Sequence, residues 1–208
     1  MAGKDGNHSK KQRILETALK LFSQKGFHAT TTKEIASECG VAEGLIFYYF
    51  GDKRKLLLEV VTHFTFFMRI QEAEEQWAKL PLEEALAQYG LRYLRFLNEH
   101  IDYLRLIWSP DMIRDETVSR EVLHLIENIG AVGGTMIGRR LAGAGDRQGE
   151  GTPEIAMTML TSSILVYFML QSRYGRSVQT LDDEAYVRRL VRLLLYGLVE
   201  SGGKPGAE

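Results

Sequence analysis

Histidine and cysteine, the side chains that most often bind metals or take part in redox chemistry, are few in this 208-residue chain. The five histidines form no H-x-x-x-H pair, and Cys39 is the single cysteine, so we predict no metal site and no intrachain disulfide. The nucleophile elbow, the phosphate loop and the dinucleotide-binding glycine motif are missing as well. The glycine-rich stretch 130–138 lies within a helical pattern and follows no strand. We therefore predict a protein that is not an enzyme and uses no cofactor.

A binding function is indicated around Gly40, where the sequence predicts two short helices, one before and one after a turn. Residues 31–34 have the form of a capping box with Thr31 as the N-cap, and Gly40 permits the left-handed backbone of a tight turn. The second helix runs from about Ala42 to Tyr48. Ile35, Val41, Ile46 and Phe50 are predicted to join these two helices and the following one in a small core. The outward face of the second helix displays Glu43, Gly44, Leu45 and Tyr48. These are the parts of a helix-turn-helix, although spacing alone is a weak signal.

The residue types are more specific than the spacing. The stretch from Thr30 to Leu56, TTTKEIASECGVAEGLIFYYFGDKRKL, strongly resembles the signature of the TetR family of repressors. The positions in register are Thr31, Ile35, Ala36, Gly40, Val41, Gly44, Tyr49, Phe50, Lys53 and Leu56, and upstream Ala18, Leu21, Phe22, Gly26 and Phe27. The resemblance covers residues 10–58, and beyond them only the number and length of the helices agree.

The resemblance implies a role at DNA for the polar and exposed positions of this segment. Thr31 and Lys33 would contact phosphates, and Tyr49 and Lys53 would hold the DNA backbone. Base edges in the major groove would be read by Glu43, Leu45 and Tyr48, with Glu43 accepting from cytosine and Leu45 touching a thymine methyl group. The complete predicted DNA-binding set is Thr31, Lys33, Ala42, Glu43, Gly44, Leu45, Tyr48, Tyr49 and Lys53.

The recognition helix departs from the family pattern at four positions. The family often has Ser or Thr in place of Ala42, and Lys or another polar residue in place of Glu43. It often has Thr in place of Leu45 and Tyr in place of Phe47. The helix is therefore less basic and more apolar, and the resemblance does not predict the operator sequence. A purely structural role is the alternative for Tyr48 and Tyr49, and for Phe50 we adopt it.

Charge is divided unevenly along the chain, whose overall net charge is −1. Residues 1–55 hold ten Lys and Arg against six Asp and Glu, and the remainder holds 16 against 21. A basic head on an acidic body is expected when one end of a protein meets DNA phosphates. The N-terminal stretch MAGKDGNHSKKQR lacks the apolar run of a signal peptide, so we expect a cytoplasmic protein.

Helical periodicity throughout the chain predicts an all-α fold of about nine helices. We place a three-helix helix-turn-helix domain at residues 1–52, with a flexible arm over 1–8, and a larger helical ligand-binding and dimerisation domain at 53–208. The first helix is expected to be capped by Ser9 and ended by Gly26, and a long fourth helix from about Lys53 includes Phe64, Phe67 and Met68. A later helix is ended by Pro110, and one or two helices follow over 111–142. After a loop over 143–151, the last two helices begin at Thr152 and Thr180.

Helices four to eight are rich in methionine and aromatic residues, which are predicted to line an apolar pocket because methionine adapts to irregular shapes. The set is Phe64, Phe67, Met68, Tyr89, Tyr93, Phe96, Tyr103, Trp108, Met112, Met136 and Tyr167. Ordinary core packing is the alternative for each of them, but together they favour a small lipophilic ligand. Gly130, Gly134 and Gly138 recur on one helical face, either for close helix approach or to leave room for that ligand.

The segment from Ile155 to Ser172 carries no charge, which is typical of a helix buried on all sides. Its hydroxyl groups and the lack of basic residues at both flanks argue against a membrane span. We predict that it forms a four-helix homodimer interface with residues 186–198 of the last helix. The predicted interface residues are Met159, Ser162, Ser163, Val166, Leu190, Leu194 and Leu198.

These patterns predict a ligand-responsive transcriptional regulator that binds a palindromic operator in double-stranded DNA as a homodimer. We expect a repressor that a lipophilic small molecule releases from DNA, with activation as an open possibility. The alternative is a helical interaction adaptor with a degenerate DNA-binding head, which the apolar recognition helix favours.

Overall fold

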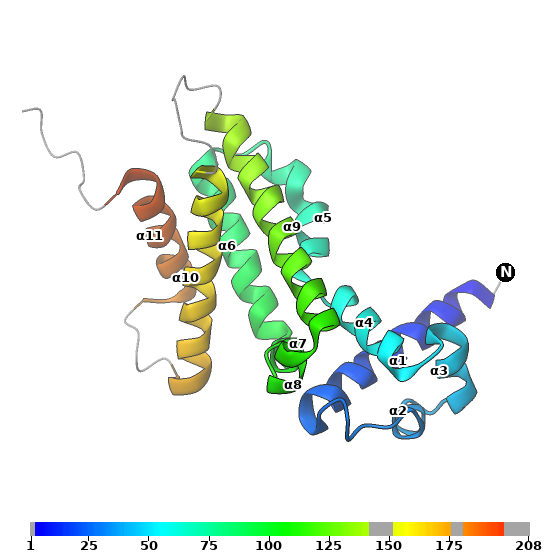
Figure 1. Cartoon of the computed structure of the whole chain (residues 1–208). Helices are drawn as coiled ribbons and strands as arrows, with labels where there is room; N and C mark the ends of the chain where they lie inside the picture. Colours follow the sequence, from blue (N-terminus) through cyan, green and yellow to red (C-terminus); the bar gives the residue numbers. More distant parts are fainter. Residues whose placement is uncertain (1–2, 142–151, 176–180, 198–208) are drawn as a thin grey trace, which may run out of the picture. The chain divides into compact units, whose positions relative to one another are not determined.

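The computed structural model describes residues 3–141, 152–175 and 181–197. In these ranges it contains eleven α-helices and no strand, so the predicted all-α class is confirmed (Figure 1). The helices are α1 (Gly3–Lys25), α2 (Thr32–Cys39), α3 (Glu43–Phe50), α4 (Lys53–His63), α5 (Phe66–Trp77), α6 (Leu82–Glu99), α7 (Ile101–Ile107), α8 (Pro110–Arg114), α9 (Glu116–Leu141), α10 (Thr152–Tyr174) and α11 (Asp183–Tyr196). The predicted loop at 143–151 and Leu198 lie outside the described residues, as do the side chains of Phe67, Met68 and Met136.

The chain divides into two compact units. The first comprises residues 1–65 and 100–126, and the second comprises residues 66–99 and 127–208. Helices α1 to α4 therefore share a unit with α7 and α8, which follow them only after α5 and α6 have been completed. The domain boundary that we predict after residue 52 stays a prediction, because compactness does not test which segment binds DNA.

Helix α1 provides the core of the first unit through the apolar stripe that its sequence predicts. Ile14, Ala18 and Phe22 are at most 1% exposed. The helix ends before Gly26, which adopts a φ of +84°, as its position predicts. The predicted start is wrong, because the helix begins at Gly3 and Ser9 lies inside it, so the predicted flexible arm overlaps its first turns. A serine cap contributes only about 1 kcal/mol, and no proline upstream prevents the helix from extending.

The long fourth helix predicted from Lys53 is interrupted. Helix α4 ends at His63, and α5 begins at Phe66, so Phe64 lies between the two helices. The Tyr103 hydroxyl donates a hydrogen bond of 3.0 Å to the Val61 carbonyl oxygen near the end of α4. In an uninterrupted helix, the Val61 carbonyl oxygen would accept from a backbone N–H group one turn later. Here a side chain 42 positions away donates to it instead.

Two other predicted boundaries also differ. Pro110 begins α8 and does not end a helix, since Ser109 caps it and proline is well tolerated at a first helical position. The segment 111–142, for which one or two helices are predicted, contains two, because the chain is divided at Asp115 into α8 and α9. Helix α11 begins after Asp182, whose carboxylate accepts from the Ala185 backbone N–H at 2.7 Å, and the predicted start at Thr180 is wrong.

In the second unit, α6 packs against α10 and α11. At Gly90 of α6, a Cβ atom would lie 2.7 Å from Val187 Cγ1 of α11 and 3.0 Å from Ile164 Cδ1 of α10. The missing side chain therefore permits the close approach of three helices. A comparable approach occurs at Gly134 of α9, where a Cβ atom would lie 3.0 Å from the Glu154 side chain of α10. For Gly134 this supports close approach over room for a ligand.

Helix α10 presents one buried and one exposed apolar face within the single chain. Met157, Leu160 and Ile164 are fully buried, whereas Met159 is 56% and Val166 54% exposed. By length and composition this helix could cross a membrane, with a mean hydropathy of 1.5. A helix that packs in the core of a soluble protein or against a second subunit has the same properties, so this observation is weak evidence for a membrane span.

Candidate nucleic-acid interface

The two short helices around Gly40 have the local geometry that their sequence predicts. The Thr31 hydroxyl accepts from the Glu34 backbone N–H at 3.1 Å, which caps α2. At the other end, Gly40 adopts φ +65° and ψ +41°, and the Val41 backbone N–H donates to the Ala36 carbonyl at 2.9 Å. The left-handed glycine turns the chain immediately after α2, so α3 can begin at Glu43.

The inward side of this unit is an apolar core. Ile35 of α2 and Ile46 of α3 are fully buried, and Phe50 is 6% exposed. Val41, which we also predict in the core, is only half-buried. Because Ile46 and Phe50 lie one helical turn apart, they fix which face of α3 points outward.

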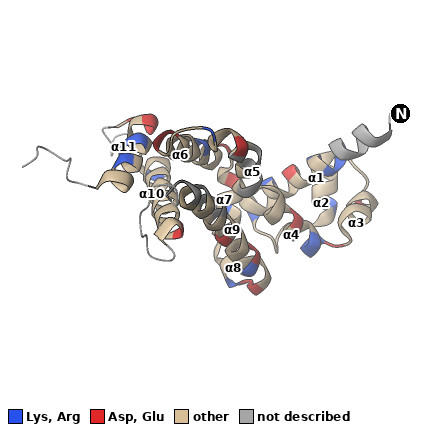
Figure 2. Cartoon of the chain, turned by 90° about the horizontal axis from the view of Figure 1, so that it is seen from above, with Lys and Arg blue, Asp and Glu red and all other residues tan. Residues whose placement is uncertain are grey.

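The outward face of α3 is apolar and aromatic. Tyr48 is 76% and Phe47 48% exposed, and Leu45 is half-buried. Ala42 and Gly44 are exposed, and no atom lies within 4 Å of a Cβ built on Gly44. The helix has no Lys or Arg, and Glu43 is its single charged residue (Figure 2). Exposed large aromatic side chains on a surface helix are suited to contact with a partner.

Glu43 is attached to the neighbouring helix. The Thr32 hydroxyl, at the first position of α2, donates a hydrogen bond of 2.6 Å to Glu43 Oε1, at the first position of α3. Both side chains are half-buried. The sequence gives no sign of this bond, because the two residues lie 11 positions apart on opposite sides of the turn.

The Lys53 ammonium group holds the loop between α1 and α2. It donates to the carbonyl oxygens of Phe27 at 2.9 Å and Thr30 at 2.8 Å, and it lies 4.4 Å from the centre of the Phe27 ring. Thr30 is itself fully buried, and its hydroxyl donates to the Gly26 carbonyl at 2.9 Å. The structure thus reveals a loop-positioning contact at Lys53 beside the phosphate contact that we predict.

The remaining candidates surround the start of α2 and the end of α3. Thr31 and Lys33 are exposed, and the Tyr49 ring lies 5.3 Å from that of Tyr48 in an edge-on arrangement. An ion pair with Lys25 of α1, together with the bond from Thr31, holds the pKa of Glu34 below its usual range. This ion pair ties the start of α2 to α1.

Arg54, the second residue of α4, is paired across the first unit with Asp115. Its guanidinium nitrogens lie 2.9 and 3.0 Å from the two carboxylate oxygens, and Nη2 is 3.1 Å from the Thr117 hydroxyl. Asp115 Oδ1 also accepts from the backbone N–H groups of Thr117 and Val118 at the start of α9. The hydrogen bonds from Arg54, above all, hold the Asp115 pKa below its usual range. This network links the beginning of α4 to the beginning of α9.

The predicted ligand-pocket residues are divided between the two units. In the second unit, the Phe66 ring lies 5.6, 4.9 and 5.3 Å from those of Tyr89, Tyr93 and Phe96. All four side chains are at most 8% exposed, and burial raises the pKa of Tyr89 to about 12. The Tyr167 ring stacks on Tyr186, with ring centres 3.8 Å apart.

The other predicted pocket residues belong to the first unit. Tyr103 and Met112 are buried there, Phe64 is half-buried, and Trp108 is 52% exposed. Their lining of a ligand pocket stays a prediction.

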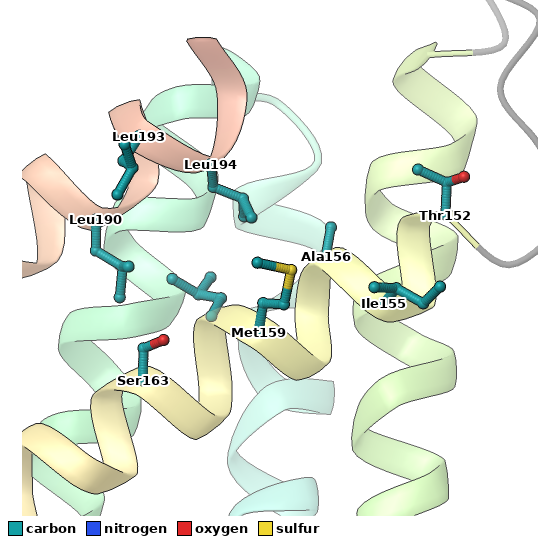
Figure 3. A pocket seen from close by; sticks show the side chains of 9 residues that line it. Thr152, Ile155, Ala156, Met159, Ser163, Leu190, Leu193 and Leu194 are labelled. Atoms are coloured by element: carbon teal, nitrogen blue, oxygen red, sulfur yellow. The ribbon is translucent and has the colours of Figure 1, made fainter. Parts of the chain in front are cut away.

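An apolar pocket of about 320 Å³ lies between α10 and α11 (Figure 3). Its lining is Thr152, Ile155, Ala156, Met159, Leu160, Ser163, Leu190, Leu193 and Leu194. Four of these, Met159, Ser163, Leu190 and Leu194, are predicted interface residues, and Val166 and Ser162 are exposed on the same helix. An apolar hollow on the exposed side of two helices can receive side chains of another molecule.

Comparison with known proteins agrees with this geometry. Residues 14–60 match the family model described as bacterial regulatory proteins, tetR family. The uncharacterized HTH-type transcriptional regulator YerO of Bacillus subtilis is 32% identical over 122 residues, which cover 57% of this chain and 42% of YerO. The HTH-type transcriptional repressor NicS of Pseudomonas putida is 27% identical over 178 residues, with 80% of this chain and 78% of NicS covered. The chain thus spans less than half of the length of YerO.

Solved structures share the fold beyond the matched domain. The transcriptional regulator FadR of Bacillus subtilis, solved in complex with stearoyl-CoA, superposes with a TM-score of 0.70 at 18% identity. The superposition covers 90% of this chain and 99% of that structure. Residues 14–60 thus match the N-terminal domain of the tetR family of bacterial regulatory proteins, and the helical fold of the chain resembles that of solved transcriptional regulators.

Proposed function

We propose that this protein is a cytoplasmic transcriptional repressor that binds a palindromic operator as a homodimer and is released from it by a lipophilic small molecule. The observation that carries the proposal is the pair of short helices α2 and α3. Buried Ile35 and Ile46 hold the pair in one orientation, in which Tyr48 faces solvent with 76% of its surface exposed. A rigid pair of helices with one outward face is the form in which a helix-turn-helix enters the major groove.

In this proposal, the base contacts come from α3, whereas the backbone contacts come from the start of α2, the end of α3 and the start of α4. Thr31 and Lys33 at the start of α2 contact phosphates, and Tyr49 and Lys53 hold the DNA backbone. Glu43, Leu45 and Tyr48 read bases, with Ala42 and Gly44 allowing close approach of α3 to the groove. The exposure of Lys33, Ala42, Gly44 and Tyr48 supports these assignments.

The homodimer is proposed to form through the exposed apolar faces of α10 and α11. Met159 and Val166 are more than half exposed in the single chain, which is unfavourable for residues of this type unless a second molecule covers them. A two-fold dimer presents two α3 helices to half-sites about 34 Å apart. Sedimentation should show a dimer that Met159→Glu converts to a monomer. Leu123→Glu on α9, at a residue 53% exposed, is the matched control and leaves the dimer intact.

For the ligand we propose a long apolar molecule that binds in the second unit. The aromatic cluster around Phe66 supports this, and so does the stearoyl-CoA complex of the similarly folded FadR. Ligand binding would shift α4 and change the separation of the two recognition helices, because α4 follows directly on the helix-turn-helix. Stearoyl-CoA is the first probe to test: it should lower the affinity for the operator, and unchanged affinity would remove this class of ligand.

The decisive experiment is selection of bound sequences from a random duplex pool. The wild type should enrich a palindrome. Lys33→Ala should weaken binding to all sequences alike, and the slope of the logarithm of the binding constant against the logarithm of the salt concentration should become less steep by about one per subunit. Tyr49→Ala should weaken binding as well. Lys79→Ala, at an exposed lysine of the second unit, is the control and has no effect. If no sequence is enriched even at low salt, the better explanation is a helical interaction adaptor with a degenerate DNA-binding head. The apolar face of α3 favours that alternative.

A further inference from the structure

The hydrogen bond between Thr32 and Glu43 is the one contact that joins the first residues of α2 and α3 through their side chains. Resting on the proposed DNA-binding function, we propose that Thr32 is a positioning residue for base recognition. It holds the Glu43 carboxylate in the orientation from which Glu43 reads a cytosine, and thereby sets the base preference at one position of each half-site.

The geometry favours this role. The distance from Thr32 Oγ1 to Glu43 Oε1 is 2.6 Å, which is short and typical of a hydroxyl that donates to a charged carboxylate. A carboxylate has two oxygens with several acceptor sites. Among the described residues, Thr32 is the single hydrogen-bond donor to the Glu43 side chain, and it engages only Oε1. Oε2 therefore retains its acceptor capacity for a group outside the protein.

The surroundings of Glu43 explain why positioning matters. Ala42, the residue before it, gives α3 no side-chain cap, and the next residue is Gly44, which has no atom within 4 Å of an added Cβ. Without the Thr32 hydroxyl, these neighbours do not restrain the long Glu43 side chain. A glutamate that rotates freely loses more conformational entropy when it contacts a base, so its preference for cytosine over other bases weakens.

A merely structural link between α2 and α3 makes a different prediction. It would stabilise the helix pair, and its loss would lower the affinity for every DNA sequence by the same factor. Positioning of Glu43 instead changes the relative affinity for different bases at one position. The pattern of base preference, and not the overall affinity, therefore distinguishes the two roles.

The test compares the sequences enriched by the wild type, Thr32→Val, Thr32→Ser, Glu43→Gln and a control. Valine keeps the shape of threonine without the hydroxyl, serine keeps the hydroxyl, and glutamine can still accept from Thr32 but carries an amide. The control Thr62→Val makes the same substitution in α4, where the hydroxyl bonds only within its own helix, to the carbonyls of Leu58 and Glu59.

We expect Glu43→Gln to change the preferred base at one symmetric position, where wild-type discrimination is about 5- to 100-fold. Thr32→Val should reduce discrimination at that same position by about two- to tenfold and leave other positions unchanged, while Thr32→Ser and Thr62→Val keep the wild-type profile. An unchanged profile for Thr32→Val, with or without a uniform loss of affinity, overturns the positioning role alone. No enriched sequence for the wild type overturns both this role and the proposed function.

Discussion

Asp115 combines two stabilising contacts, and substitution of Arg54 and Asp115 separates them. Its Oδ1 accepts from the Thr117 and Val118 backbone N–H groups at 3.0 and 3.1 Å, which caps α9. Both of its oxygens also pair with the Arg54 guanidinium at 2.9 and 3.0 Å. Asp115→Ala removes the cap and the ion pair, and Asp115→Asn keeps the cap but removes the charge. Arg54→Ala keeps the cap and removes the ion pair together with the hydrogen bond to the Thr117 hydroxyl.

The magnitudes follow from burial. A helix cap contributes about 1 kcal/mol. The Arg54 side chain is 50% exposed and that of Asp115 18%, so solvent screens the pair and it contributes about 0.5–1 kcal/mol despite its two-pronged geometry. We therefore expect Asp115→Ala to lower the free energy of unfolding by about 1.5–2 kcal/mol, and Asp115→Asn and Arg54→Ala by about 0.5–1 kcal/mol each.

Urea unfolding at neutral pH, followed by far-ultraviolet circular dichroism, measures these differences. The double variant Arg54→Ala/Asp115→Asn should be no less stable than the weaker single variant, because both remove the same interaction. If the two single losses simply add, or if Arg54→Ala costs as much as Asp115→Ala, the division into cap and ion pair is wrong.

The pH dependence provides an independent check on the ion pair. The paired Arg54 holds the Asp115 pKa below its usual value in the folded protein. The contribution is therefore complete above the unfolded pKa, about 4, and is lost as the pH falls through the lower folded pKa. The stability difference between the wild type and Asp115→Asn should be constant from pH 6 to 8 and shrink below pH 4. A difference that grows on acidification would refute this sign.

Three further substitutions test the fold. Gly40→Ala places a Cβ atom on a backbone with φ +65° and should cost about 1–2 kcal/mol in urea unfolding; no loss would mean that the turn relaxes. Tyr103→Phe removes the donor to the Val61 carbonyl and should lower stability by about 1–2 kcal/mol, seen in the same assay, unless a water replaces the hydroxyl. Gly90→Ala forces a methyl group to 2.7 Å from Val187 Cγ1 and should cost about 1–3 kcal/mol in thermal unfolding, whereas equal stability would show that α6 and α11 separate easily.

The helix-turn-helix could be predicted from the sequence because its signals are local. The Thr31 cap acts on a backbone N–H three positions away, and Gly40 determines its own backbone angles. The period of the apolar residues then selects Ile35, Ile46 and Phe50 for the core. Each of these inferences needs only neighbours within about one helical turn, so the sequence by itself determined the motif and its outward face.

The tertiary structure decided the features that depend on distant residues. The break after α4 accompanies a hydrogen bond from Tyr103, 42 positions from its acceptor. The acceptors of Lys53 lie 26 and 23 positions away, and the donor to Glu43 lies 11 positions away. Periodicity and capping preferences describe how a residue suits its own helix, and they do not specify which distant group faces its side chain. The partners of Lys53 and Glu43, on which the geometry of the candidate DNA surface depends, are therefore properties of the folded chain.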